Sequence, residues 1–142
     1  MRNRLFIALL FSSVGLSAGC SGLNTLQRAE YQVMKDKGMA VEEKNPNVAA
    51  ALGLLPGCGS FYTRQLTLGV VDLLFWPASI LWDPFVGYSG AEVINYDVSR
   101  AYAKKHKEKE LADLEHLKED NRITQAEFID RRRSIDSKYN FD

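Results

Sequence analysis

The sequence has no excess of either charge. Its 142 residues include 18 basic and 18 acidic side chains, so the formal net charge at pH 7 is zero. A protein that binds the phosphates of nucleic acid needs a surplus of lysine and arginine. We therefore expect no nucleic acid among the partners of this chain.

Motifs of catalysis and metal binding are also lacking. The 2 histidines, His106 and His116, stand ten positions apart, and no cluster of cysteine and histidine has the spacing of a metal site. A nucleophile elbow of the form G-x-S-x-G does not occur. The loop "LPGCGSFYTRQ" (55–65) has Tyr62 where a dinucleotide fingerprint needs its third glycine, and it lacks the lysine of a P-loop. We predict that the chain is not an enzyme and has no catalytic residue, metal or cofactor.

Long apolar runs are absent as well, and the first short one lies at the N-terminus. Arg2 and Arg4 precede an apolar stretch over 5–16 and small residues over 17–19. This layout is typical of a secretory signal peptide (1–19), and its apolar stretch is too short to span a bilayer. Loss of the signal leaves 16 basic residues against 18 acidic ones, a net charge of about −2.

A cysteine follows this signal directly. The segment "LSAGC" (16–20) resembles a bacterial lipobox, which implies cleavage before Cys20 and attachment of a covalent lipid, diacylglycerol and a further acyl chain such as palmitate. Two or more acyl chains anchor a protein stably. By the same resemblance, Ser21 in place of aspartate favours the outer membrane over the inner membrane. We expect a lipid-anchored, periplasm-facing protein of the cell envelope, with membrane lipid as a partner.

Cys58 is then the only thiol of the mature chain, so no intramolecular disulfide can form. It could cross-link two copies, act as a nucleophile or pack as a small buried residue. The sequence leaves these three alternatives open.

An amphipathic helix is predicted near the lipid anchor. Apolar residues recur at three- and four-residue spacing from Leu23 to Met34, and Gly38 is a suitable C-cap. A polar linker follows, and Pro46 marks its end. We therefore assign 20–45 to an N-terminal amphipathic helix and linker.

Two apolar runs, 48–62 and 66–82, predict a helical hairpin within 46–90. As helices they would be roughly 22 and 25 Å long, against a hydrocarbon core of about 30 Å, and Pro56 and Pro77 would kink or end them. Either the hairpin lies in or on the membrane, with Trp76 and Trp82 as interfacial aromatics. Or the two runs form a core that flanking amphipathic helices bury.

A carboxylate inside the second run is unfavourable unless it has a partner. Asp72 could pair with Arg64, accept hydrogen bonds from backbone amides or line a polar path. These two residues, with Trp76 and Trp82, form the predicted structural or membrane site. The Asp-Pro pair at 83–84 is expected to end the second run.

The segment "ALGLLPGCGSFYTRQLTLGVVDLLFWPASILWDP" (51–84) resembles the two-transmembrane-helix hairpin domain in its lipoprotein form. The resemblance covers roughly 46–98 and implies an apolar hairpin without catalytic residues. Cys58 stands where close relatives have glycine. The matching positions are Gly57, Gly59, Phe61, Tyr62, Leu68, Gly69 and Asp72.

From residue 91 the chain is highly charged, and its sparse apolar residues mark one face of each of two predicted helices. The first carries Leu111, Leu114 and Leu117 and runs to about residue 120. Thr124 and Glu127 form a capping box that starts a second helix, which runs to about residue 138. The segment 91–142 is therefore predicted to be a charged helical hairpin.

The segment "NRITQAEF" (121–128) resembles part of the bacterial short C-terminal domain (SHOCT). Domains of this kind mediate interaction or oligomerisation. The resemblance implies a protein partner or a homo-oligomer. A solvated helical pair is the alternative, and the arginines could also touch lipid head groups or an acidic partner. The predicted partner surface comprises Leu111, Leu114, Phe128, Arg131, Arg132 and Arg133.

The sequence thus predicts an all-α, lipid-anchored protein in which an apolar helical hairpin precedes a charged C-terminal one. The predicted function is a non-enzymatic structural, assembly or protein-interaction role at the envelope membrane. The alternative function is a membrane-active or pore-forming protein that acts through its oligomerised apolar hairpin.

Overall fold

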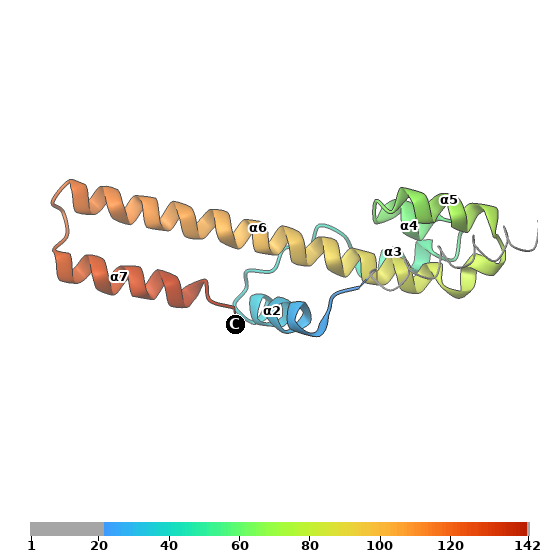
Figure 1. Cartoon of the computed structure of the whole chain (residues 1–142), viewed down its shortest axis with the longest axis horizontal. Helices are drawn as coiled ribbons and strands as arrows, with labels where there is room; N and C mark the ends of the chain where they lie inside the picture. Colours follow the sequence, from blue (N-terminus) through green and yellow to red (C-terminus); the bar gives the residue numbers. More distant parts are fainter. Residues whose placement is uncertain (1–21, 142) are drawn as a thin grey trace, which may run out of the picture. The chain divides into compact units, whose positions relative to one another are not determined.

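The computed structural model describes residues 22–141, and all regular secondary structure within that range is helical (Figure 1). This confirms the all-α prediction for the described residues. The predicted signal peptide and Cys20 lie outside them. The chain forms two compact units. Unit 1 consists of Glu43–Asn95 with the described residues up to Leu26, and unit 2 consists of Gln27–Glu42 and 96–141.

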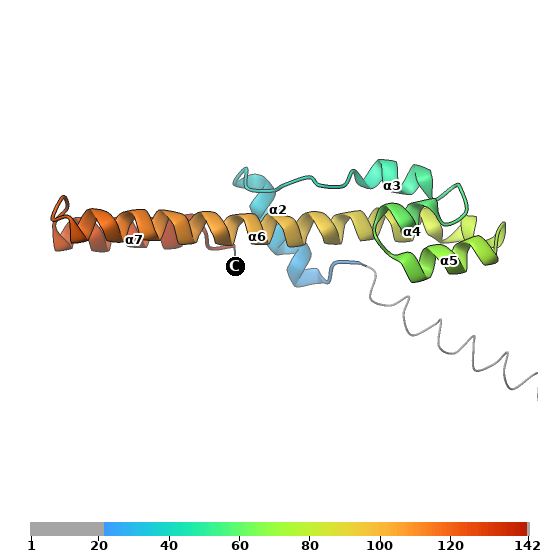
Figure 2. The ribbon, with the colours of Figure 1, turned by 90° about the horizontal axis from the view of Figure 1, so that it is seen from above.

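Unit 1 contains a series of short helices, visible in Figure 2. They are α3 (Pro46–Leu52), α4 (Cys58–Tyr62), α5 (Leu66–Leu74), the 3-10 helix η2 (Ala78–Leu81) and the first part of α6 (Asp83–Glu119). Helix α4 packs against both α3 and α5. The prediction of a hairpin of two long apolar helices is therefore wrong, because each apolar run is divided into two short helices.

Capping and turn residues explain the division of the first run. Asn45 caps α3, since its side-chain oxygen accepts hydrogen bonds from the backbone N–H groups of Asn47 and Val48. Gly53 ends α3, and Gly57 has a φ of 72° at the start of α4. A left-handed conformation of this kind favours glycine and interrupts a helix. The chain therefore turns between 53 and 57.

The second run is interrupted around Pro77, which follows Trp76 through a cis peptide bond. Helix α5 ends at Leu74, and α6 begins at Asp83 with Pro84 in its first turn. Proline is favoured at the first helical position, and a carboxylate there interacts well with the helix dipole. The Asp-Pro pair follows directly on the end of the second run, as expected, and it also begins α6, the longest helix in the part of the chain described here.

Glycine brings the backbones of unit 1 into contact. A Cβ atom on Gly59 of α4 would lie 2.9 Å from the Cα of Gly53, and one on Gly87 of α6 would lie 2.7 Å from the carbonyl oxygen of Ala49. Neither distance is possible for a real side chain, so both positions require glycine. Helices α3, α4 and α6 therefore pack backbone against backbone.

Unit 2 contains most of α2 (Thr25–Asp36), the remainder of α6 and α7 (Gln125–Lys138). The rings of Tyr31 on α2 and Tyr96 on α6 meet edge to face, with centroids 6.3 Å apart. Thr124 and Glu127 form the predicted capping box at the start of α7, which confirms that prediction. Helices α6 and α7 run side by side in Figures 1 and 2.

Charged side chains hold α7 in place within unit 2. Lys107 of α6 pairs with Asp136 of α7 at 2.8 Å, and Glu110 pairs with Lys138. The ammonium group of Lys37 donates hydrogen bonds to the carbonyl oxygens of 137, 138 and 140, at 3.2, 3.2 and 2.6 Å. A cation at this position satisfies carbonyl groups that the end of a helix leaves without partners.

Candidate functional site

The interior of unit 1 is built from small and polar residues. Between positions 46 and 94, no buried residue is larger than threonine or aspartate. A water-soluble domain of ordinary design buries Leu, Ile, Val and Phe instead. The buried residues are Ala49, Gly53, Gly57, Gly59, Ser60, Thr63, Gly69, Asp72, Ser79, Asp83, Gly87, Ser89, Gly90 and Ala91.

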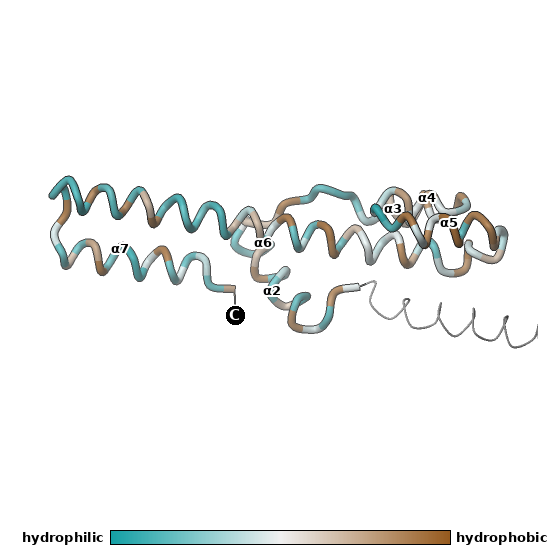
Figure 3. The backbone as a smooth tube through the Cα atoms, turned by 45° about the horizontal axis from the view of Figure 1, so that its top comes forward, coloured by the Kyte–Doolittle hydropathy of each residue, from teal (hydrophilic) through white to brown (hydrophobic). Residues whose placement is uncertain are grey.

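Most large apolar side chains of 46–94 are exposed and the others are partly exposed, and Figure 3 shows the hydrophobic colour concentrated along α5. We define the apolar surface as the large apolar residues of 66–85 that are at least half exposed. It comprises Leu66, Val70, Leu73, Leu74, Phe75, Trp76, Leu81 and Phe85. The interpretation in which flanking helices bury both apolar runs does not hold for these residues.

Helix α5 has an exposed apolar face. Leu66, Val70 and Leu73 recur at spacings of four and three, so they share this face. Gly69 and Asp72 lie on the adjacent face and are buried. Helix α5 is therefore amphipathic in reverse, with its apolar face outward and its small and charged residues inward.

Two aspartates meet inside unit 1. The hydroxyl oxygen Oγ of Ser60 on α4 lies 2.9 Å from Oδ2 of Asp72 on α5 and 2.7 Å from Oδ1 of Asp83 at the start of α6. The backbone N–H of Ser60 also donates to Oδ1 of Asp83, at 3.1 Å. All three residues are at most 1% exposed. The cluster joins three helices through one hydroxyl group.

Of the predicted structural or membrane site, two residues come together and two do not. The indole Nε1–H of Trp82 donates to Oδ1 of Asp72 at 2.6 Å. Arg64 pairs with Glu43 instead of Asp72. Trp76 is 56% exposed and belongs to the apolar surface. Asp72 thus obtains its partners from side chains of unit 1, and backbone amides and Arg64 are not among the partners found.

The environment of Asp83 favours its neutral form. Burial raises the pKa of its carboxyl group above the ordinary value of 3.8, and the nearby charge of Asp72 raises it further. Hydrogen bonds from Ser60 oppose the shift. One carboxyl oxygen, Oδ2 of Asp83, is buried without a hydrogen-bond partner among the described residues, as is Oγ of Ser79.

Polar residues gather on the segments that flank these helices. Arg64 follows α4 with a φ of 64° and pairs with Glu43 in the linker before α3. The ammonium group of Lys44 lies 4.4 Å from the ring centre of Tyr62, and the Tyr62 hydroxyl accepts a hydrogen bond from the N–H of Asn45. Glu43, Lys44 and Arg64 thus lie on the segments that connect the helices, and none of them belongs to the apolar surface.

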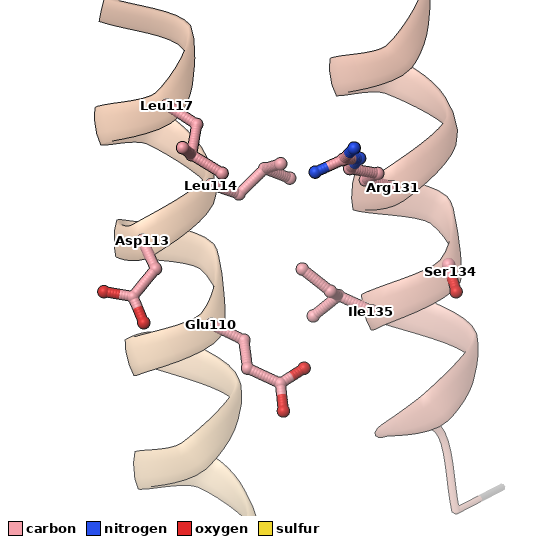
Figure 4. A pocket seen from close by; sticks show the side chains of 7 residues that line it. All are labelled: Glu110, Asp113, Leu114, Leu117, Arg131, Ser134 and Ile135. Carbon is pink, nitrogen blue, oxygen red and sulfur yellow. The ribbon is translucent and has the colours of Figure 1, made fainter. Parts of the chain in front are cut away.

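The predicted partner surface divides into two kinds of residue. Leu114 is 4% exposed and packs within unit 2, so it is not available to a partner. Leu111 and Phe128 are partly exposed, and the three arginines, 131–133, are exposed. Figure 4 shows the shallow groove between α6 and α7, into which Glu110, Leu114 and Ile135 project.

No metal centre is evident in the described part of the chain, since no three side chains of His, Cys, Asp or Glu gather there. Cys58 is a free, partly exposed cysteine at the start of α4. No helix between residues 22 and 141 combines the length and the apolar character that a membrane-spanning segment needs.

Sequence reasoning missed two members of the buried cluster, Ser60 and Asp83. A useful signal was present, since Asp72 and Asp83 are the only acidic residues between positions 44 and 91. Two isolated carboxylates in an apolar segment need partners, and each carboxyl group could be a partner of the other. Nothing in the sequence marked Ser60 as the group between them.

No protein-family model, curated protein or solved structure matches this chain in the comparisons made.

Proposed function

We propose that this chain is a non-enzymatic, lipid-anchored envelope protein with a structural or assembly role, and that its apolar surface lies in the membrane. The observation that carries the proposal is the reversed polarity of 46–94, where every buried residue is small or polar and most large apolar residues are exposed. The lipobox resemblance at Cys20 supports attachment of the chain to the same membrane.

A lipid environment explains this reversed distribution. Helices in lipid gain little by burying leucine, and they associate through small residues that let backbones approach closely. The glycine contacts of α3, α4 and α6 are of that kind. In water, eight large apolar side chains left half exposed or more would make a patch of the sort that marks an interaction site.

The short helices of unit 1 match one leaflet. Helix α5 has 9 residues and is therefore roughly 13 Å long, close to half of a hydrocarbon core of about 30 Å. The stretch 65–82 has no charged residue except Asp72, which is buried. We infer that α5 and η2 enter only one leaflet of the bilayer, the same leaflet that would hold the acyl chains of Cys20, and do not cross the membrane.

Unit 2 is the part of the chain that we assign to the aqueous side. Its helices are rich in charge, and α7 has no buried residue. Its exposed arginines and its resemblance to the short C-terminal domain support binding of a partner protein or a second copy. The outer membrane is the favoured location.

Flotation with vesicles tests the proposal. The mature chain with Cys20→Ser, which has no lipid, should float with vesicles of phosphatidylethanolamine and phosphatidylglycerol. Leu74 and Leu81 are 74% and 86% exposed, so replacing both by asparagine should leave the fold intact. Because each buried leucine contributes about 1.5–3 kcal/mol, the double variant should bind vesicles at least tenfold more weakly.

Ile129→Asn is the matched control, because Ile129 is 41% exposed on α7 of unit 2. It should float as the parent chain does. A parent chain that stays with the soluble fraction would contradict the membrane assignment. If the parent chain released a dye from the vesicles and Asp72→Leu abolished that release, a membrane-permeabilising role would replace the structural one.

A further inference from the structure

Ser60 has one hydroxyl hydrogen and two carboxylate neighbours. Its Oγ lies within hydrogen-bond distance of Asp72 and of Asp83. A hydroxyl group donates one hydrogen bond, so it can satisfy only one of these oxygens. The second short oxygen–oxygen contact needs a hydrogen of its own, and only a protonated carboxyl group can provide it.

One proton on the pair completes the hydrogen bonding. If Asp83 is protonated, its carboxyl group donates to Oγ of Ser60, and Ser60 donates to Oδ2 of Asp72. The Nε1–H of Trp82 then fills Oδ1 of Asp72. Ser60 and the two carboxyl groups therefore form one hydrogen-bonded unit that is complete with one proton.

The burial of Asp83 supports its neutral form. Its Oδ2 has no hydrogen-bond partner among the described residues. A buried oxygen that carries part of a negative charge is far more costly without a partner than a neutral one. Burial also raises the pKa of this group, in the same direction.

Among the described residues of unit 1, no cation is found paired with the two carboxyl groups, and Lys44 lies over the ring of Tyr62. Helices α3 and η2 carry no titratable side chain, and α5 carries only Asp72. Arg64 is the single basic residue between positions 45 and 99, and it pairs with Glu43. The other titratable groups of α4 and of 84–95 supply no positive charge: Cys58, Tyr62, Tyr88 and Glu92.

We propose that Asp72, Ser60 and Asp83 form a buried proton-binding site whose occupancy controls how the apolar surface binds the membrane; the second half of this statement rests on the proposed function. When the proton leaves, two negative charges face each other across Ser60 at positions that are at most 1% exposed. Their repulsion and their need for water both favour separation of α5 from α4 and α6.

Separation is favoured because the hydrogen bonds of the cluster link α4, α5 and α6 through buried polar groups. The other contact of α5 with α4 is made by Gly69, which lies against the backbone of Gly57 and the ring of Phe61, and no large apolar side chain of 46–94 is buried. We expect the protonated unit to present the apolar surface intact and the deprotonated unit to lose it. Binding of one proton should therefore strengthen membrane binding, by up to about tenfold for each pH unit across the transition.

A pH titration of the mature Cys20→Ser chain tests the site, with and without vesicles of phosphatidylethanolamine and phosphatidylglycerol. Tryptophan fluorescence is a suitable probe, because Trp82 donates to Asp72. Between about pH 4 and pH 9 we expect one fluorescence step above the usual aspartate range, and weaker flotation above that step. Asp83→Asn should remove the step and retain the low-pH flotation at every pH.

Glu43→Gln is the control, since it removes a carboxylate that pairs with Arg64 outside the cluster. It should leave the step in place. Infrared spectroscopy of the parent chain needs no variant and should show a protonated carboxyl band above about pH 5.

Three results would overturn the proposal: no such band, a step that persists in Asp83→Asn, or a chain that binds vesicles but whose flotation does not change across the step. A fluorescence step in a chain that never binds vesicles supports the proton site and contradicts the proposed function.

Discussion

At the scale of single residues, the packing of unit 1 depends on residues with very small side chains or none. Gly59 and Gly87 have no Cβ, and the neighbouring backbones occupy the space that a side chain would need. The small side chain of Ser60 on α4 reaches one carboxyl group on α5 and another at the start of α6. Each of these positions tolerates few other residues, although none of them contributes a large apolar area.

Gly87→Ala should therefore destabilise unit 1. The added methyl group would lie 2.7 Å from the carbonyl oxygen of Ala49, which is backbone and cannot rotate away. Gly90→Ala is the comparison variant on the same helix, where the nearest atom is the end of the flexible Gln65 side chain and the next are Cβ and Oγ1 of Thr63, both at 3.0 Å. Both variants gain about 1 kcal/mol of helix propensity.

We expect Gly87→Ala to lie about 1–3 kcal/mol below Gly90→Ala in the free energy of unfolding. Chemical denaturation followed by circular dichroism measures the difference. Equal stability of the two variants would mean that α3 and α6 do not pack as closely as described.

At the scale of helices, the charged half of the chain was easier to predict than the apolar half. The leucine spacing indicated the charged part of α6, and the Thr124–Glu127 capping box located the start of α7, because each of these signals acts within a few residues. The apolar half was predicted as two long helices, since periodicity cannot reveal a turn at Gly57 or the start of α6 at Asp83. Those features depend on packing between segments distant in sequence.

The candidate site shows the same limit. The isolated position of Asp72 indicated that it needed a partner, but Ser60 and Trp82 became its partners only through the folding of α4 and α5. No local pattern specifies that meeting. The exposure of the apolar face of α5 was likewise invisible to periodicity, which identifies a face but not the side that is buried.

The pairing of α6 with α7 should weaken in acid. A hydrogen bond from Lys138 lowers the pKa of Glu110 below its ordinary value of 4.5. A lowered pKa in the folded chain adds stability above the unfolded pKa, and that stability is lost as the pH falls through the folded pKa. Hydrogen exchange of the α7 amides should therefore accelerate below about pH 4.5.

Glu110→Gln should remove this acid dependence, and Glu115→Gln, which changes an exposed residue of the same helix, should retain it. The effect should shrink in high salt, because both partners are partly exposed. Acid-dependent exchange that is unchanged in Glu110→Gln would show that another group is responsible.

At the scale of the whole molecule, the two units differ in the solvent that suits them. Unit 1 has an interior of small and polar residues and an apolar exterior, whereas unit 2 has charged, water-exposed helices. A protein held by a lipid at a membrane surface meets both solvents at once. The central claim is that unit 1 is itself a membrane element and does not depend on the lipid for its attachment.

Carbonate extraction of cells that express the Cys20→Ser chain behind a cleavable ordinary signal tests this claim most directly. The account predicts that the unlipidated chain stays in the membrane pellet, because the apolar surface of α5 and η2 remains in the bilayer. Complete release of a folded, helical chain into the supernatant would contradict it, because the lipid would then be the only anchor.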